Sequence, residues 1–86
     1  PGGVVNILTG QRSELTGQFA SHMDVNAIVW CDGGRKAGRE IQELAAENVK
    51  RVFKRARVDW SQDSAQHPYL IRETQEVKTT WHPIGT

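Results

Sequence analysis

The stretch that decides the fold is Asn26 to Gly38, NAIVWCDGGRKAG. An apolar run from Ala27 to Cys31 is followed by the turn Asp32-Gly33-Gly34, and a helical pattern starts at Arg35. A strand, a tight glycine turn and a helix in this order form a crevice that can hold a phosphate, because the first backbone N–H groups of the helix have no partner within it. The stretch therefore predicts a strand-to-helix unit whose turn could hold a phosphate, although a simple tight turn without a ligand is favoured.

Length and composition set the outer limits. The 86 residues leave room for one domain, and no apolar run approaches the roughly 20 residues of a membrane span. The net charge of +1 implies no strong field toward nucleic acid or membranes. The single cysteine, Cys31, excludes an internal disulfide, so with no secretory signal we expect a cytoplasmic protein. Because the chain opens without Met, we expect it to belong to a longer protein or a processed product.

Four segments flank or extend the central unit. Val4 to Leu8 is a short apolar run typical of a strand buried on both faces. Gln11 to His22 is expected to be a helix, and Arg35 to Asn48 has the clearest helical stripe of apolar residues. Val49 to Val58 alternates basic and apolar residues, which predicts a half-exposed edge strand.

The remainder is predicted to be a linker and an extended arm. Asp59 to Pro68 is polar and ends in proline, as a linker does. Tyr69 to Ile71 begins an extended segment, and Thr74 to Trp81 alternates as a strand. The fold class is therefore α/β, with a small parallel sheet forming half of a doubly wound, Rossmann-like βαβαβ unit and a C-terminal extended arm. The predicted units are residues 1–58, 59–68 and 69–86, and a ligand is expected beyond the carboxyl ends of the strands.

Several motifs occur in the order found in one family. The runs PGGVVNILTG, LTGQFASHMDVNAIVW and GGRKAGREIQELAAENVKRV resemble the NAD-binding domain of the aldehyde dehydrogenase superfamily, from Pro1 to about Val52. ETQEVKTTW, from Glu73 to Trp81, is similar to the family's E-Y-T-E-V-K-T-V segment, which lies in its oligomerisation arm. The resemblance implies an NAD crevice at the glycine turn and a homo-oligomer built by the arm.

The chain departs from the family at the turn. Where the family has F-T-G-S-T-x-x-G, this chain has Cys31 to Gly38, and the first and last glycines keep their places. Gly34 replaces a serine that contacts the cofactor pyrophosphate, and Asp32 adds a negative charge where phosphate should lie. We therefore expect NAD to bind weakly or not at all. The residues expected to contact it are Gly33, Gly34, Arg35 and Gly38.

The chemical groups of the family are also replaced. Its V-T-L-E-L-G-G-K strand carries the general-base Glu, and Arg55 takes that position here; no segment matches the domain that carries the nucleophilic Cys. No catalytic residue is expected. The resemblance favours a non-catalytic aldehyde-dehydrogenase-like fragment that acts in oligomerisation, with at most weak nucleotide binding. The alternative is the cofactor-binding part of an NAD(P)-dependent aldehyde oxidoreductase completed by residues outside this chain.

Other candidate sites each have a simpler explanation. Cys31 has no neighbouring His in sequence to activate it, so a packed or partly exposed core thiol is favoured over a nucleophile. The histidines lack the spacing of metal ligands, and no metal is expected. A basic cluster could bind nucleic acid, but a solvated strand edge is favoured. Its members are Lys50, Arg51, Lys54, Arg55 and Arg57. The aromatic side chains of Trp60, Tyr69 and Trp81 could anchor the tail as a cluster or form an exposed patch.

Overall fold

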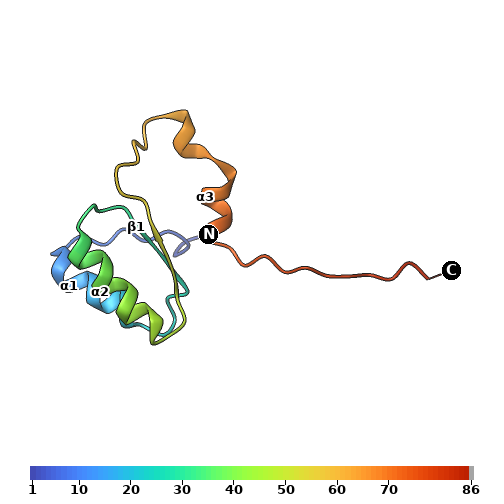
Figure 1. The fold of residues 1–86 in the computed structure, drawn as a ribbon, viewed down its shortest axis with the longest axis horizontal. Helices are drawn as coiled ribbons and strands as arrows, with labels where there is room; N and C mark the ends of the chain where they lie inside the picture. The colour runs from blue at the N-terminus through green and yellow to red at the C-terminus, as the bar shows by residue number, and fades with distance from the viewer. Residues whose placement is uncertain (86) are drawn as a thin grey trace.

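The structure is a computed structural model that describes residues 1–85. Its elements are α1 (Arg12–Ser21), β1 (Ala27–Trp30), α2 (Arg35–Ala46), β2 (Arg51–Lys54), the 3-10 turn η1 (Asp63–Gln66) and α3 (Pro68–Glu73). Figure 1 shows α1 and α2 lying beside each other against the strands, whereas α3 lies apart from them. The α/β class is confirmed. None of the described helices is both long and apolar enough to cross a membrane.

The sheet consists of β1 and β2, which pair in parallel as predicted. Ala27 lies opposite Arg51, and Trp30 lies opposite Lys54. One further backbone bond, from Arg55 N to Trp30 O at 2.8 Å, continues the pairing past the last paired residues. The carboxyl ends of both strands therefore meet at one edge, which is where ligands of parallel sheets bind.

Helix α2 packs against this sheet because its apolar residues follow the helical period. Ile41 is 1% exposed and is the largest fully buried side chain among the described residues, with Ala45 and Gly38 buried on the same face. A Cβ at Gly38 would lie 3.4 Å from Lys54 Cδ and 3.7 Å from Trp30 Nε1. These are ordinary van der Waals distances, so Gly38 lies in contact with the strands, and a Cβ would also fit there.

A side-chain bond connects the two helices at their far ends. The amide of Asn48, just after α2, donates from Nδ2 to the backbone carbonyl of Ser21 at 2.8 Å. Ser21 is the last residue of α1, and carbonyls at a helix end have no partner within the helix. The bond satisfies one of these carbonyls and fixes α1 against α2.

The predicted strand at Val4 to Leu8 is wrong, so the sheet has two strands instead of three. The segment has no strand structure, and its apolar side chains are exposed, with Ile7 at 89%. A strand buried on both faces needs a neighbouring strand and a covering layer. Nothing among residues 1–85 covers this one.

Two further boundaries differ from the prediction. β2 ends at Lys54 instead of Val58, and Arg57, at φ 65, has left the extended backbone region. The extended segment predicted at Tyr69 to Ile71 is helical. Pro68 occupies the first turn of α3, and the imidazole of His67 caps it by accepting a hydrogen bond from Tyr69 N. This local start signal outweighs the β-propensity of the residues that follow it.

The tail leads away from the folded part in Figure 1. Residues 74–85 form no helix or strand, so the strand predicted at Thr74 to Trp81 is not paired within the described chain. Trp81 is 83% exposed, and Trp60 and Tyr69 are also exposed. No ring contact joins the three aromatic side chains among residues 1–85, so of the two alternatives the structure supports exposed side chains. Thr86, at the end of the predicted arm, lies outside the described residues.

Candidate functional site

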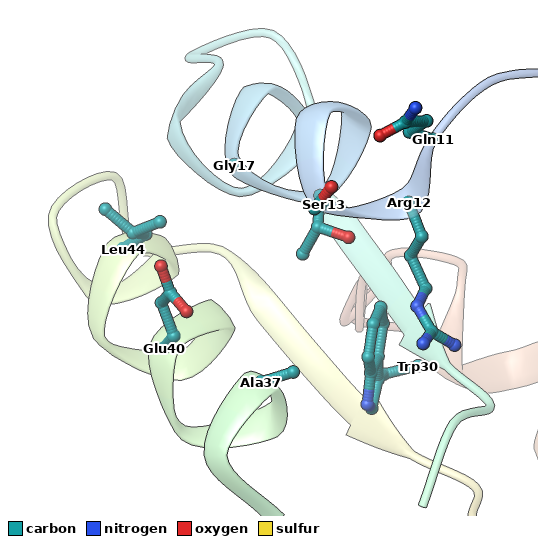
Figure 2. A pocket seen from close by; sticks show the side chains of 9 residues that line it. Gln11, Arg12, Ser13, Gly17, Trp30, Ala37, Glu40 and Leu44 are labelled. Atoms are coloured by element: carbon teal, nitrogen blue, oxygen red, sulfur yellow. The ribbon is translucent and has the colours of Figure 1, made fainter. Parts of the chain in front are cut away.

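An open cavity of about 640 Å³ lies between α1, α2 and the carboxyl end of β1. In Figure 2 the side chains of α2 form one wall, and Arg12 and Trp30 stand on the opposite side. The lining combines hydroxyl, amide and charged groups with apolar surface. It consists of Gln11, Arg12, Ser13, Thr16, Gly17, Trp30, Ala37, Glu40 and Leu44. Trp30 places it near the carboxyl end of β1, but none of the four predicted cofactor contacts lines it.

The glycine turn leads directly into α2 beside this cavity. Gly34 is the N-cap in an extended conformation, φ −66 and ψ 114, and its carbonyl accepts the first helical bond from Gly38 N at 3.0 Å. The backbone N–H groups of the first turn remain without partners inside the helix. Arg35 and Lys36 add positive charge to this turn, which already carries the positive end of the helix dipole. The turn can therefore attract an anion.

Asp32 is paired with a cation that sequence reasoning missed. Its carboxylate forms an ion pair with Arg12, the first residue of α1. The Arg12 guanidinium also lies 5.9 Å from the ring centroid of Trp30. The negative charge that opposes phosphate at the turn is therefore matched locally. The two residues are far apart in sequence, so no local pattern could have indicated the pair.

The structure separates the four predicted cofactor contacts into two groups. Gly33, Gly34 and Arg35 lie at the exposed turn, where a ligand could reach them. Gly38 is buried against the side chains of Lys54 and Trp30. Gly38 is thus covered by the packing of α2 on the sheet, whereas the other three are exposed.

Trp30 is a site residue that the sequence analysis did not single out. Its ring lines the cavity, and its Nε1 is buried with no hydrogen-bond partner among the described residues. A buried indole N–H usually has a partner. Position at the end of a strand was the only available signal, because ligand contacts gather there in parallel sheets.

Cys31 and the histidines do not form a reactive or metal-binding group. Cys31 is exposed just beyond β1, which excludes the packed thiol of the two forms expected. His22 and His67 each accept a backbone N–H through Nδ1, from Asp24 at 3.2 Å and Tyr69 at 3.3 Å. Within residues 1–85 no three His, Cys, Asp or Glu side chains come together as metal ligands.

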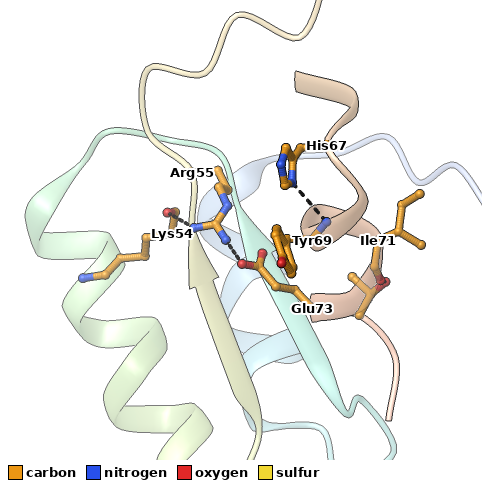
Figure 3. A network of polar contacts seen from close by, with 7 residues as sticks. Lys54, Arg55, His67, Tyr69, Ile71 and Glu73 are labelled. Atoms are coloured by element: carbon orange, nitrogen blue, oxygen red, sulfur yellow. Dashed lines mark hydrogen bonds and ion pairs between the residues drawn. The ribbon is translucent and has the colours of Figure 1, made fainter. Parts of the chain in front are cut away.

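Two members of the basic cluster, Lys54 and Arg55, contact other parts of the chain. Lys54 Nζ donates to Gln42 Oε1 at 2.8 Å on α2. Arg55 forms a half-buried ion pair with Glu73 of α3, and its other terminal nitrogen donates to the Lys54 carbonyl at 3.1 Å (Figure 3). These contacts connect β2 to the helices on both sides of it. They account for two of the cationic side chains without a nucleic acid.

Comparisons with known proteins agree with this geometry. The profile described as "Aldehyde dehydrogenase family" matches residues 1–55, which contain the whole strand-turn-helix unit and the cavity. Aldehyde dehydrogenase family 2 member C4 of Arabidopsis thaliana is 45% identical over 53 residues, which is 60% of this chain and 10% of that protein. Cytosolic aldehyde dehydrogenase 1 of Elephantulus edwardii is 43% identical over 53 residues, with the same two coverages of 60% and 10%.

The matched residues form a short stretch of each relative. The chain spans about a tenth of the length of the curated relatives it matches. No solved structure shows a significant match to it. The profile nevertheless covers well over half of the chain, and it includes both strands and both of the helices that pack on them. The chain belongs to the aldehyde dehydrogenase family.

Proposed function

We propose that this chain is a non-catalytic part of an aldehyde dehydrogenase fold that binds NAD weakly. The observation that carries the proposal is the cavity between α1 and α2, which opens beside the turn where Arg12 matches the charge of Asp32. A pyrophosphate at the turn would meet backbone N–H groups and the side chains of Arg35 and Lys36. The remainder of the nucleotide would then extend into the cavity.

Binding is expected to be weak for two reasons. Gly34 has no hydroxyl to donate to the pyrophosphate, and the cavity is open to solvent instead of enclosing its ligand. Arg12 must also share its charge between Asp32 and any incoming phosphate. The net attraction at the turn is therefore smaller than the number of cations suggests.

Titration calorimetry with NAD tests this proposal. The chain should bind NAD with a dissociation constant above about 100 μM, so the free energy of binding should be smaller than about 5.5 kcal/mol in magnitude. Gly34→Ser should tighten binding, because a Cβ there would lie 3.9 Å from Ala37 Cβ, an ordinary contact. Arg12→Gln should weaken it by exposing the charge of Asp32, and Arg39→Gln, on the exposed side of α2, serves as the control. Low-micromolar binding by the unchanged chain would contradict the proposal.

The chain alone should not oxidise aldehydes. Arg55 stands where the family has its general base, and a guanidinium cannot accept a proton. The ion pair with Glu73 also holds Arg55 against α3. Purified chain mixed with NAD and an aldehyde should give no NADH absorbance above the protein-free rate. Turnover that survives Cys31→Ser and Arg55→Gln would reveal chemistry from other residues, and any turnover would overturn this part of the proposal.

Oligomerisation is the second proposed role, and the exposed tail favours it. Val77, Trp81 and Ile84 are 72%, 83% and 98% exposed. Their backbone forms no strand pairing within residues 1–85. An extended segment of this kind can complete the sheet of a second copy or of the rest of a larger protein. The cytosolic relative and the single cysteine support a cytoplasmic setting for this assembly.

Light scattering after size exclusion tests the role of the tail. The intact chain should be a dimer or larger at micromolar concentration, and a chain truncated after Gln75 should be a monomer. This truncation retains α3 and the Arg55–Glu73 pair. Trp81→Ala should weaken association by about 3 kcal/mol if the ring is fully buried at the contact, whereas Glu76→Gln is the control. A monomeric intact chain would reject the role.

A further inference from the structure

A second cavity, of about 480 Å³, lies beyond the carboxyl end of β2. The segment that follows the family match forms most of its wall, because the matched residues end at 55 and the lining continues through η1 to α3. Figure 3 shows Arg55, His67, Tyr69 and Glu73 around the space between β2 and α3. This cavity shares no lining residue with the one between α1 and α2.

Four charged side chains line the second cavity, and three of them already have hydrogen-bond or ion-pair partners among the described residues. Arg55 and Glu73 form an ion pair with each other. The Asp59 carboxylate accepts hydrogen bonds from Ser61 N at 3.0 Å and from Ser61 Oγ at 2.6 Å, and these bonds lower the pKa of that carboxyl. Arg57 forms no hydrogen bond or ion pair among the described residues. One cation is therefore available in the cavity wall.

His67 supplies an N–H donor in the wall of the same cavity. Its Nδ1 accepts the backbone N–H of Tyr69 at 3.3 Å, so the proton of the neutral ring is on Nε2. The His67 ring also stacks on the Tyr69 ring, with the two centroids 4.9 Å apart. Arg72 Cζ lies 4.5 Å from the centroid of the Tyr69 ring. The imidazole is thus fixed in orientation, and Nε2–H has no partner among the described residues.

We propose that this cavity binds a small organic oxyanion, a carboxylate or a phosphate monoester, through Arg57 and His67. The guanidinium presents paired N–H donors that match the oxygens of either group. The Nε2–H of His67 adds one uncharged donor, and the hydroxyl of Ser64 is present in the same wall. Asp59 remains negatively charged nearby, which favours a ligand with one or two charges over a more highly charged one.

Titrations with inorganic phosphate, glycerol phosphate and succinate, followed by amide NMR shifts of the full chain at low salt, test this proposal. Saturable shifts should appear in residues 57–69, and they should follow a binding curve separate from any shifts that phosphate causes at residues 33–36. Arg57→Gln should weaken binding at least fivefold, and Arg39→Gln, which removes the same charge from α2, should not. The relative affinities for phosphate esters and succinate distinguish the two kinds of ligand.

The histidine contribution requires a variant that preserves α3. His67→Ser retains an N-cap acceptor for Tyr69 N but removes the Nε2–H donor. It should weaken binding about threefold while the amide spectrum of α3 remains in place. Equal losses in the Arg57 and Arg39 variants, or shifts that do not saturate, would overturn the proposal. Neither outcome affects NAD binding at the α2 turn, since the two cavities are separate.

Discussion

The segment from α1 to β2 and the two ends of the chain differ in how far their apolar side chains are buried. In the central segment, Ala20, Ile41 and Ala45 are almost completely buried, because two helices and two strands cover one another. At the ends, Ile7 and Ile84 are 89% and 98% exposed. The comparison teaches that the centre covers its own core, although Met23 and Val49 are exposed there too, whereas nothing described among residues 1–85 covers Ile7 or Ile84.

The centre should therefore respond most strongly to the loss of a side chain. Ile41→Ala removes the largest fully buried side chain and should lower the free energy of unfolding by about 3 kcal/mol. In a domain this small, such a loss can remove most of the stability. Urea unfolding followed by circular dichroism measures it. Ile84→Ala is the matched control and should change the unfolding free energy of the monomer by less than about 0.5 kcal/mol.

The next test concerns the junction between the two kinds of region. Arg55→Gln breaks the half-buried pair with Glu73 that holds α3 to the end of β2. The side chains are about a quarter exposed, so the coupling should be about 1 kcal/mol, between that of surface and buried pairs. A double-mutant cycle with Glu73→Gln measures it, and limited proteolysis should cut residues 57–67 faster in either single variant. Fully additive effects would show that the pair does not hold α3.

Sequence reasoning succeeded where structure depends on neighbours within one helix or one strand-turn-helix unit. The boundaries of α2 and β1 were close because Ile41 and Ala45 repeat at the helical period and the glycine turn follows at once. It failed for Val4 to Leu8, whose pattern is typical of a strand but which pairs with no strand among residues 1–85. A periodic pattern predicts which side chains of a segment would be buried. It does not predict whether another part of the structure is present to cover them.

In the candidate site, too, the parts set by neighbouring residues were predicted and the parts set by packing were not. The glycine turn was predicted from adjacent residues, but Arg12 beside Asp32 and Trp30 in the cavity wall depend on how α1 packs. The helix α3 was missed for a different reason. Its start signal, His67-Pro68, was present in the sequence, but the apolar residues after it were interpreted as an extended segment. The division into 1–58, 59–68 and 69–86 stays a prediction.

A smaller effect is expected where α1 and α2 meet at their ends. Asn48→Ala removes the 2.8 Å bond from Nδ2 to the Ser21 carbonyl. Because the site is exposed, water can replace the lost donor, and the free energy of unfolding should fall by about 0.5 kcal/mol. Hydrogen exchange should accelerate in the last turn of α1 before it does in α2. Asn48→Gln, which retains an amide donor on a longer side chain, should recover part of the protection.

The smallest effect belongs to the loop after β2, where structure is local. Hydrogen bonds from Ser61, through its hydroxyl and its backbone N–H, hold the pKa of the Asp59 carboxyl below its usual 3.8. A carboxyl whose pKa is lower in the folded state stabilises that state above the unfolded pKa, and the contribution disappears as the pH falls through the folded pKa. Ser61→Ala should therefore raise the pKa of Asp59 toward 3.8, as measured by carboxyl ¹³C titration. The loss of stability should be complete above that pH and should disappear as the pH falls through the lower, folded pKa. Ser64→Ala, in the same loop, is the control. An unchanged Asp59 titration in Ser61→Ala would show that the hydroxyl does not contribute to the shift.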